Sequence, residues 1–136
     1  MLSFKYIIFP FTLIILSQFI KVCIEYIKNK EISFARFVNG MGGMPSTHSA
    51  LVSSLSTVIC LDYGITSPIF AITFIFSLVI IYDAMGIRYE SGKQAEAINK
   101  FTGSKLKEKI GHKPIEVLVG IFLGVLVTII LNIIIK

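Results

Sequence analysis

Serine, threonine and histidine gather where a glycine-rich stretch meets an apolar run, at residues 40–50, which read GMGGMPSTHSA. Pro45 suits the first turn of a helix, because it lacks the amide hydrogen that would go unpaired there. Glycines such as Gly43 allow close backbone approach, and the free amides of a helix start favour phosphate. That turn would carry Ser46, Thr47, His48 and Ser49. The segment therefore predicts a phosphate site; the alternative is a helix capped by its own side chains.

A second histidine and a carboxylate lie at the start of the last apolar run, where residues 111–120 read GHKPIEVLVG. Pro114 again favours a helix start. His112 and Glu116 are four residues apart, so the carboxylate can hold one imidazole nitrogen and orient the other. The spacing predicts a histidine that is oriented by a carboxylate. The alternative, a solvated histidine, is weakened because both histidines stand at proline-started helix entrances.

An acidic and a basic residue lie where the third apolar run ends, in residues 83–94, which read DAMGIRYESGKQ. Asp83 ends the run and Arg88 follows five residues later. An ionisable residue at membrane depth is costly and usually has a partner or a function. We expect Arg88 to bind an anion and Asp83 to support the site. The alternative is a structural ion pair of Asp83 with Arg88 or Lys21.

The elements that position these residues are predicted to be membrane helices. The chain has 136 residues, of which 54% are hydrophobic and only 15% charged, whereas soluble domains are about a quarter charged. A membrane-spanning helix needs about 20 largely apolar residues. The predicted spans are residues 4–27, 45–61, 66–83 and 115–135. The sequence thus predicts an all-α polytopic membrane protein, a single domain over 1–136 whose four transmembrane helices form a bundle.

The second span is rich in small hydroxyl residues, which suit close helix packing in a bilayer, so we expect it to be hidden from lipid. The longest connection, residues 84–114, is basic, and residues 94–101 and 105–110 are predicted as short amphipathic helices. Such segments beside membrane spans usually lie on the membrane surface. A solvated charged loop is the alternative.

Charge predicts the orientation in the cell membrane. With four spans, the first and third connections share one side, which collects 11 of the 13 basic residues. The positive-inside rule then places both long connections in the cytoplasm and both termini outside. This topology brings the three polar segments to the cytoplasmic face, where Lys21 and Arg36 add further cations. An anionic head group with its tail in lipid fits such a pocket.

The segments PSTHSA, YDAMGIR with SGKQA, and GHKPIEV, in that order, closely resemble the divergent branch of the type 2 phosphatidic acid phosphatase superfamily, described as acid phosphatase/vanadium-dependent haloperoxidase-related. The resemblance covers nearly the whole chain. It implies that His112 is the nucleophile, Glu116 its carboxylate partner and His48 the general acid. It also implies that Arg88 binds phosphate, with Ser46 at the matching serine.

The sequence departs from the superfamily pattern at several positions. Thr47 stands where the Pro-Ser-Gly-His motif has glycine, and Arg88 precedes His112 by 24 residues, where the superfamily has a short gap. The Lys…Arg-Pro motif is missing, with Lys21 and Arg36 as stand-ins. These departures motivate an alternative function: a non-catalytic binder or transporter of anionic lipid or phosphate.

The sequence therefore predicts an integral membrane phosphatase that hydrolyses a lipid phosphate or pyrophosphate through a phosphohistidine. No cofactor, resident metal or nucleic-acid partner is expected. A third reading makes His48, Asp83, His112 and Glu116 ligands of zinc or manganese, and a structural or partner-binding role is the last alternative. The four-residue spacing of Gly120 and Gly124 predicts a helix-contact face, for which we expect a homodimer.

Overall fold

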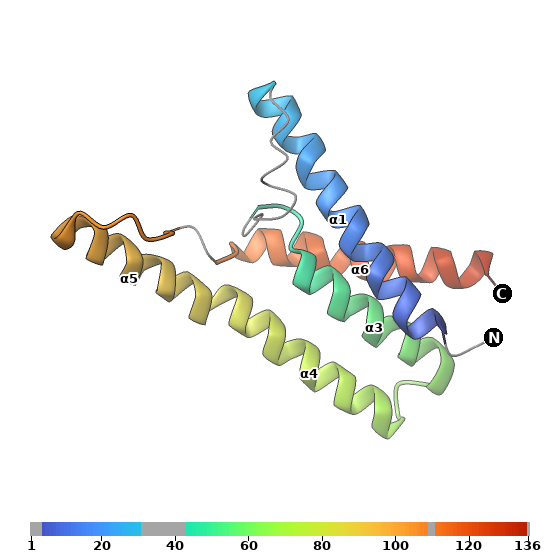
Figure 1. Ribbon diagram of the computed structural model, residues 1–136. Coiled ribbons are helices and arrows are strands. Elements are labelled where there is room, and N and C mark those ends of the chain that lie inside the picture. Colours follow the sequence, from blue (N-terminus) through green and yellow to red (C-terminus); the bar gives the residue numbers. More distant parts are fainter. Residues whose placement is uncertain (1–3, 31–42, 109–110, 136) are drawn as a thin grey trace.

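Helices account for all the regular structure in the part of the chain that the computed structural model describes, residues 4–30, 43–108 and 111–135 (Figure 1). They are α1 (Lys5–Asn29), α3 (Thr47–Tyr63), α4 (Pro68–Met85), α5 (Ile87–Thr102) and α6 (Pro114–Ile134). Four of these helices match the predicted spans to within two residues at each end. The prediction of an all-α protein is therefore confirmed.

Helix α3 is the centre of the bundle, and α1, α4 and α6 each pack against it. Its serines form interhelical hydrogen bonds: Ser54 Oγ lies 2.6 Å from Thr128 Oγ1 of α6, and Ser56 Oγ lies 2.8 Å from Ser77 Oγ of α4. Most side chains of α3 between Ser49 and Ile59 are buried. The prediction of an interior helix is confirmed, because its hydroxyl groups find partners on neighbouring helices instead of facing lipid.

Two glycines of α6 allow this close approach. A methyl group on Gly120 would lie 2.5 Å from the Ser46 carbonyl oxygen, and one on Gly124 would lie 2.5 Å from the Ala50 carbonyl oxygen. The predicted helix-contact face is therefore occupied by α3 of the same chain. The glycine pair is not available for a second copy, so it no longer supports the predicted homodimer.

Within the described residues, three stretches are long and apolar enough to cross a membrane: α1, α4 continued by α5, and α6. Helix α3 has 17 residues, and at 1.5 Å per residue it extends about 25 Å. It is shorter than the others and lies among them. The protein is thus an all-α membrane protein, and its described residues include three clear spans and α3 as a fourth, interior helix.

The predicted loop at 84–114 is wrong in its first half, because α5 follows α4 with only Gly86 between them and extends away from the bundle (Figure 1). Of the two short helices predicted in this connection, the one at 94–101 is confirmed as helical and the one at 105–110 is wrong. The first lies within the longer α5, which ends where Gly103 adopts a left-handed backbone (φ 68°). Residues 105–108 are not helical, since Asn99 hydrogen-bonds both the amide and the carbonyl of Leu106; residues 109 and 110 lie outside the described residues.

The two ends of the bundle carry different polar clusters. At one end, where α1 begins and α6 ends, the Lys5 ammonium lies 2.6 Å from Asp62 Oδ1 and the Tyr6 hydroxyl donates to Asp62 Oδ2. The other end gathers the residues that the sequence singled out for chemistry, from α1, α3, α4, α5 and α6. The relative positions of helix ends thus agree with the predicted topology.

Candidate active site

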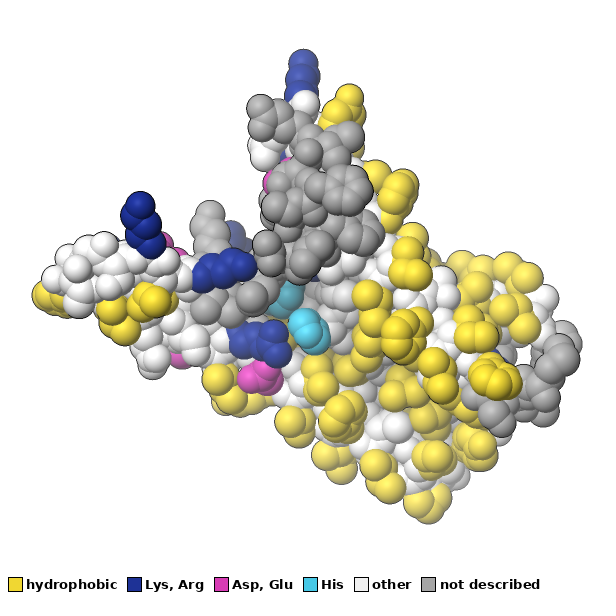
Figure 2. Space-filling view, viewed as in Figure 1, with side chains coloured by type: hydrophobic (Ala, Val, Ile, Leu, Met, Phe, Trp, Pro, Cys, Tyr) yellow, Lys and Arg dark blue, Asp and Glu magenta, His cyan; other side chains and the backbone are white. Residues whose placement is uncertain are grey.

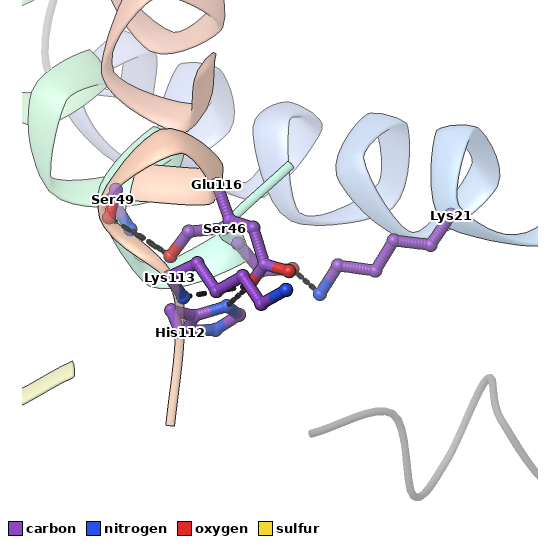
Figure 3. A network of polar contacts seen from close by, with 7 residues as sticks. Lys21, Ser46, Ser49, His112, Lys113 and Glu116 are labelled. Atoms are coloured by element: carbon purple, nitrogen blue, oxygen red, sulfur yellow. Dashed lines mark hydrogen bonds and ion pairs between the residues drawn. The ribbon is translucent and has the colours of Figure 1, made fainter. Parts of the chain in front are cut away.

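The pair of His112 and Glu116 is fixed by the first turn of α6. Glu116 is the third residue of that helix, and its Oε2 accepts a hydrogen bond from the Lys113 amide at 3.2 Å. The same oxygen lies 3.0 Å from Nδ1 of His112 (Figure 3). A carboxylate only accepts hydrogen bonds, so Nδ1 must carry the proton, and a neutral ring then has its lone pair on Nε2. This arrangement gives His112 one defined nucleophilic nitrogen.

The backbone around His112 is held by the end of α4 and the start of α5. The His112 amide donates to the Ala84 carbonyl at 3.0 Å. A methyl group on Gly111 would lie 2.6 Å from the backbone nitrogen of Tyr89, so only glycine fits there. Sequence reasoning missed both contacts; the glycine directly before His112 was the signal that a close approach occurs here.

The environment of His112 favours its neutral form. Only 6% of the residue's surface is exposed, and this burial lowers the pKa of His112 below its ordinary value. The hydrogen bond to Glu116 opposes the shift, whereas the charges of Lys21 and Arg88 add to it. A nucleophilic imidazole must be unprotonated, and the site supplies that state near neutral pH.

The start of α3 is joined directly to α6. The Ser46 amide donates to the Glu116 carbonyl at 2.9 Å. The Ser46 hydroxyl caps α3: it accepts from the Ser49 amide, and its oxygen lies 2.9 Å from the Ser49 hydroxyl (Figure 3). This is the capping role that the sequence left as an alternative for the segment. Ser46 therefore fixes the loop beside Glu116, and its partner Ser49 belongs to the same predicted first turn.

A buried lysine reaches the same place from α1. Lys21 is 5% exposed, and its ammonium donates to the Thr47 hydroxyl at 2.9 Å, across the α1–α3 contact. Figure 3 shows its side chain extending from α1 toward the cluster of Ser46 and Glu116. A cation thus lies at the N-terminal end of α3, where the helix dipole also favours an anion.

Asp83 and Arg88 form the ion pair that the sequence gave as an alternative. The Arg88 Nε lies 2.8 Å from Asp83 Oδ2, and both side chains are about a third or more exposed. His48 is exposed on the first turn of α3, and the charges of Arg88, Lys21 and Asp83, as well as His112, act on it. Histidine, basic and acidic side chains gather on one face of the molecule (Figure 2).

Comparison with known proteins identifies a family for the chain. Residues 2–127 match the family model described as "Divergent PAP2 family". The chain belongs to the Divergent PAP2 family. It is also 38% identical to the "Uncharacterized membrane protein YuiD" of Bacillus subtilis (strain 168), over 87% of this chain and 87% of that protein. No solved structure matches the chain.

Membership of the Divergent PAP2 family confirms the resemblance found in the sequence, and with it a membrane protein related to the type 2 phosphatidic acid phosphatases. Of the residues that the sequence predicts for the site, the structure brings the following to one end of the bundle: Lys21, Ser46, Thr47, His48, Asp83, Arg88, His112 and Glu116. Gly43 lies just before them with a left-handed backbone (φ 88°). Arg36 lies outside the described residues.

The proposed metal ligands of this Divergent PAP2 family member do not form a metal centre. Within residues 4–30, 43–108 and 111–135, no three His, Cys, Asp or Glu side chains are grouped closely enough to hold a metal ion. His112 directs Nδ1 to Glu116, and Asp83 is engaged with Arg88. The reading of His48, Asp83, His112 and Glu116 as zinc or manganese ligands therefore has no geometric support.

Proposed function

We propose that the protein is an integral membrane phosphatase that hydrolyses a lipid phosphate or pyrophosphate through a phosphohistidine on His112. The observation that carries the proposal is the 3.0 Å contact between His112 Nδ1 and Glu116 Oε2. It orients the ring and leaves Nε2 as the attacking atom. Membership of the Divergent PAP2 family supports the reaction class.

The proposed reaction has two steps. In the first, the Nε2 lone pair attacks phosphorus, the bond from phosphorus to the lipid oxygen breaks, and the leaving oxygen takes a proton from His48. In the second, water attacks phosphorus, the phosphorus–nitrogen bond breaks, inorganic phosphate leaves, and His48 accepts the proton that water releases. A covalent intermediate of this kind replaces one difficult displacement by two easier ones.

The charges around His112 suit the other parts of this reaction. Lys21 lies at the start of α3, and the positive charges of Lys21 and Arg88 act on His112. The Arg88 guanidinium has five N–H donors, and the contact with Asp83 uses the one on Nε. We propose that its terminal nitrogens bind two phosphate oxygens, while Glu116 stabilises the positive charge that develops on the attacking imidazole.

The test is phosphate release by the purified full-length protein in nanodiscs. The substrates are a polyprenyl phosphate, a polyprenyl pyrophosphate and a phosphatidic acid. We expect turnover of at least one of them, its loss in His112→Ala and His48→Ala, and near-wild-type rates in Lys93→Ala, an exposed position on α5. A labelled, acid-labile and alkali-stable phosphoenzyme should form in the wild type and be absent in His112→Ala. Failure of the folded protein to release phosphate from all three lipids would reject the proposal.

A second candidate function is binding or transport of an anionic lipid or phosphate without turnover. The buried Lys21 at the N-terminal end of α3 favours it, because this cation and helix start bind an anion whether or not His112 reacts. This function predicts that His112→Ala retains binding of a lipid phosphate and that Lys21→Met loses it, measured by titration in nanodiscs. Hydrolysis that His112→Ala abolishes would reject it in favour of the phosphatase.

We propose that the site faces the cytoplasm and that both termini lie outside, because the connections at the site end carry most of the basic residues. A protease site fused to the N-terminus tests this orientation. We expect cleavage in intact cells treated with external protease, and cleavage only after lysis would reverse the assignment.

A further inference from the structure

Helix α5 carries an apolar stripe that no other described part of the chain covers. Three of its large apolar residues, Ile87, Ile98 and Phe101, are separated by 11 and 3 residues, so they lie on one side of a helix of 3.6 residues per turn. Phe101 is 91% exposed, Ile87 61% and Ile98 45%. Large apolar side chains at this level of exposure, grouped along one side, indicate a contact surface and not a solvated helix.

The opposite side of α5 is charged. Helical spacing places Lys93 and Lys100 away from the stripe, and each forms an exposed ion pair within the helix, with Glu90 and Glu96 respectively. The return segment 103–108 is tied to α5 by Asn99, which hydrogen-bonds the backbone of Leu106. This segment adds Lys105 and Lys107. Basic residues therefore exceed acidic ones in the whole unit of residues 87–108.

The stripe is placed to meet the bilayer that contains α4. Ile87 follows the last residue of α4 by two positions, and α4 begins a stretch that is long and apolar enough to cross a membrane. The stripe therefore starts where α4 leaves the bilayer. The two helices are joined at Gly86, whose backbone angles (φ −94°, ψ −80°) already depart from those of a regular helix.

We propose that α5 is a lipid-binding helix that bends at Gly86 and lies on the membrane surface next to the site. Ile87, Ile98 and Phe101 enter the boundary between head groups and acyl chains. Lys93 and Lys100 remain in the head-group layer and favour anionic lipids. The occupant of the stripe is the bilayer itself. The proposal excludes an α5 that is surrounded by water and an α5 that pairs with a second copy of the chain. It does not depend on the phosphatase activity.

The test measures the depth of single labelled positions in the full-length protein. Cys23 and Cys60 are replaced by serine, and an environment-sensitive fluorophore is attached to cysteine at position 98, 101 or 96 in separate variants. The proteins are placed in nanodiscs of phosphatidylcholine with or without phosphatidylglycerol. Labels at 98 and 101 are expected to be quenched by lipids spin-labelled on the acyl chain and shielded from aqueous iodide. The label at 96, on the charged side, is the matched control and should show the reverse.

The contribution of the lysines is measured by the same quenching assay. Each lysine near an anionic surface contributes roughly fivefold to partitioning. We therefore expect Lys93→Gln and Lys100→Gln to reduce the lipid-quenched fraction in anionic nanodiscs and to have little effect in phosphatidylcholine alone.

Two results would overturn the proposal. The first is equal iodide quenching at 96, 98 and 101 in anionic nanodiscs, which would mean that α5 is in water. The second is shielding from iodide at 98 and 101 without quenching by spin-labelled lipid, which would mean that protein covers the stripe. If that shielding disappears in nanodiscs that hold one chain each, the cover is a second copy.

Discussion

Substitution of Gly120 by alanine tests the central packing contact, because this glycine lies where α6 meets the first turn of α3. The added methyl group would be 2.5 Å from the Ser46 carbonyl oxygen and 3.2 Å from the Ser46 nitrogen. Both are backbone atoms that cannot rotate away. Ordinary van der Waals contact begins at 3.4 Å, so the start of α3 must move by about 0.9 Å.

The cost of this movement follows from the contacts it disturbs. Overpacking costs about 1–3 kcal/mol. The hydrogen bond from the Ser46 amide to the Glu116 carbonyl, 2.9 Å long, would be stretched beyond bonding range, at a cost of about 1 kcal/mol. Alanine favours the helix by about 1 kcal/mol relative to glycine. The net loss in the free energy of unfolding is about 1–3 kcal/mol.

The assay is thermal unfolding of the purified protein in detergent, followed with a thiol-reactive dye. Cys23 and Cys60 are free and only partly exposed, so their reaction reports opening of the bundle. The matched control is Val125→Ile, which adds one methyl-sized group on an exposed position of the same helix. We expect a lower unfolding midpoint for Gly120→Ala than for the wild type, and an unlowered midpoint for Val125→Ile. If Gly120→Ala melts with the wild type, the close α3–α6 contact is wrong.

Three further predictions concern the two polar ends. Because burial lowers the pKa of His112 and the ring must be neutral to attack, hydrolysis of the lipid phosphate should persist below pH 6.5, the ordinary histidine pKa. The rate should fall only at more acidic pH. A pH–rate profile that already falls with acidification above pH 6.5 would contradict the claim that burial lowers this pKa. Glu116→Gln should lower kcat by roughly 10²-fold or more while the fold is kept. The glutamine amide can donate to Nδ1 of His112 and so impose the tautomer that has its proton on Nε2. An unchanged kcat would remove Glu116 from the mechanism. At the far end of the bundle, Asp62→Asn should destabilise the protein by roughly 1–3 kcal/mol, because Lys5 and Tyr6 both hydrogen-bond that carboxylate. The KM for the lipid phosphate should stay unchanged. Thermal melts check the stability and initial rates check the KM, both on the same preparation.

The sequence by itself determined the features that depend on local pattern. Hydropathy located the apolar helices, because a bilayer selects continuous apolar runs. The spacing of His112 and Glu116 within about one helical turn was enough to predict that their side chains meet. The same holds for Asp83 and Arg88, which are close in sequence across the α4–α5 junction.

Only the tertiary structure decided which surfaces meet. The spacing of Gly120 and Gly124 indicates a contact face, but it does not say whether the partner is α3 or a second copy. The pairing of Lys21 with Thr47 joins residues 26 positions apart and depends on how α1 packs against α3.

The full length of α5 does not follow from the sequence, because its polar composition resembles that of a loop. The helix forms because it extends α4, and extension of an existing helix avoids the cost of nucleation. Its end, in turn, depends on Asn99, whose side chain supplies Leu106 with the hydrogen bonds that a helix would have given. Local pattern therefore fixes where helices form and which nearby residues pair. Contacts between distant segments depend on side-chain shape and packing, which no single stretch of sequence contains.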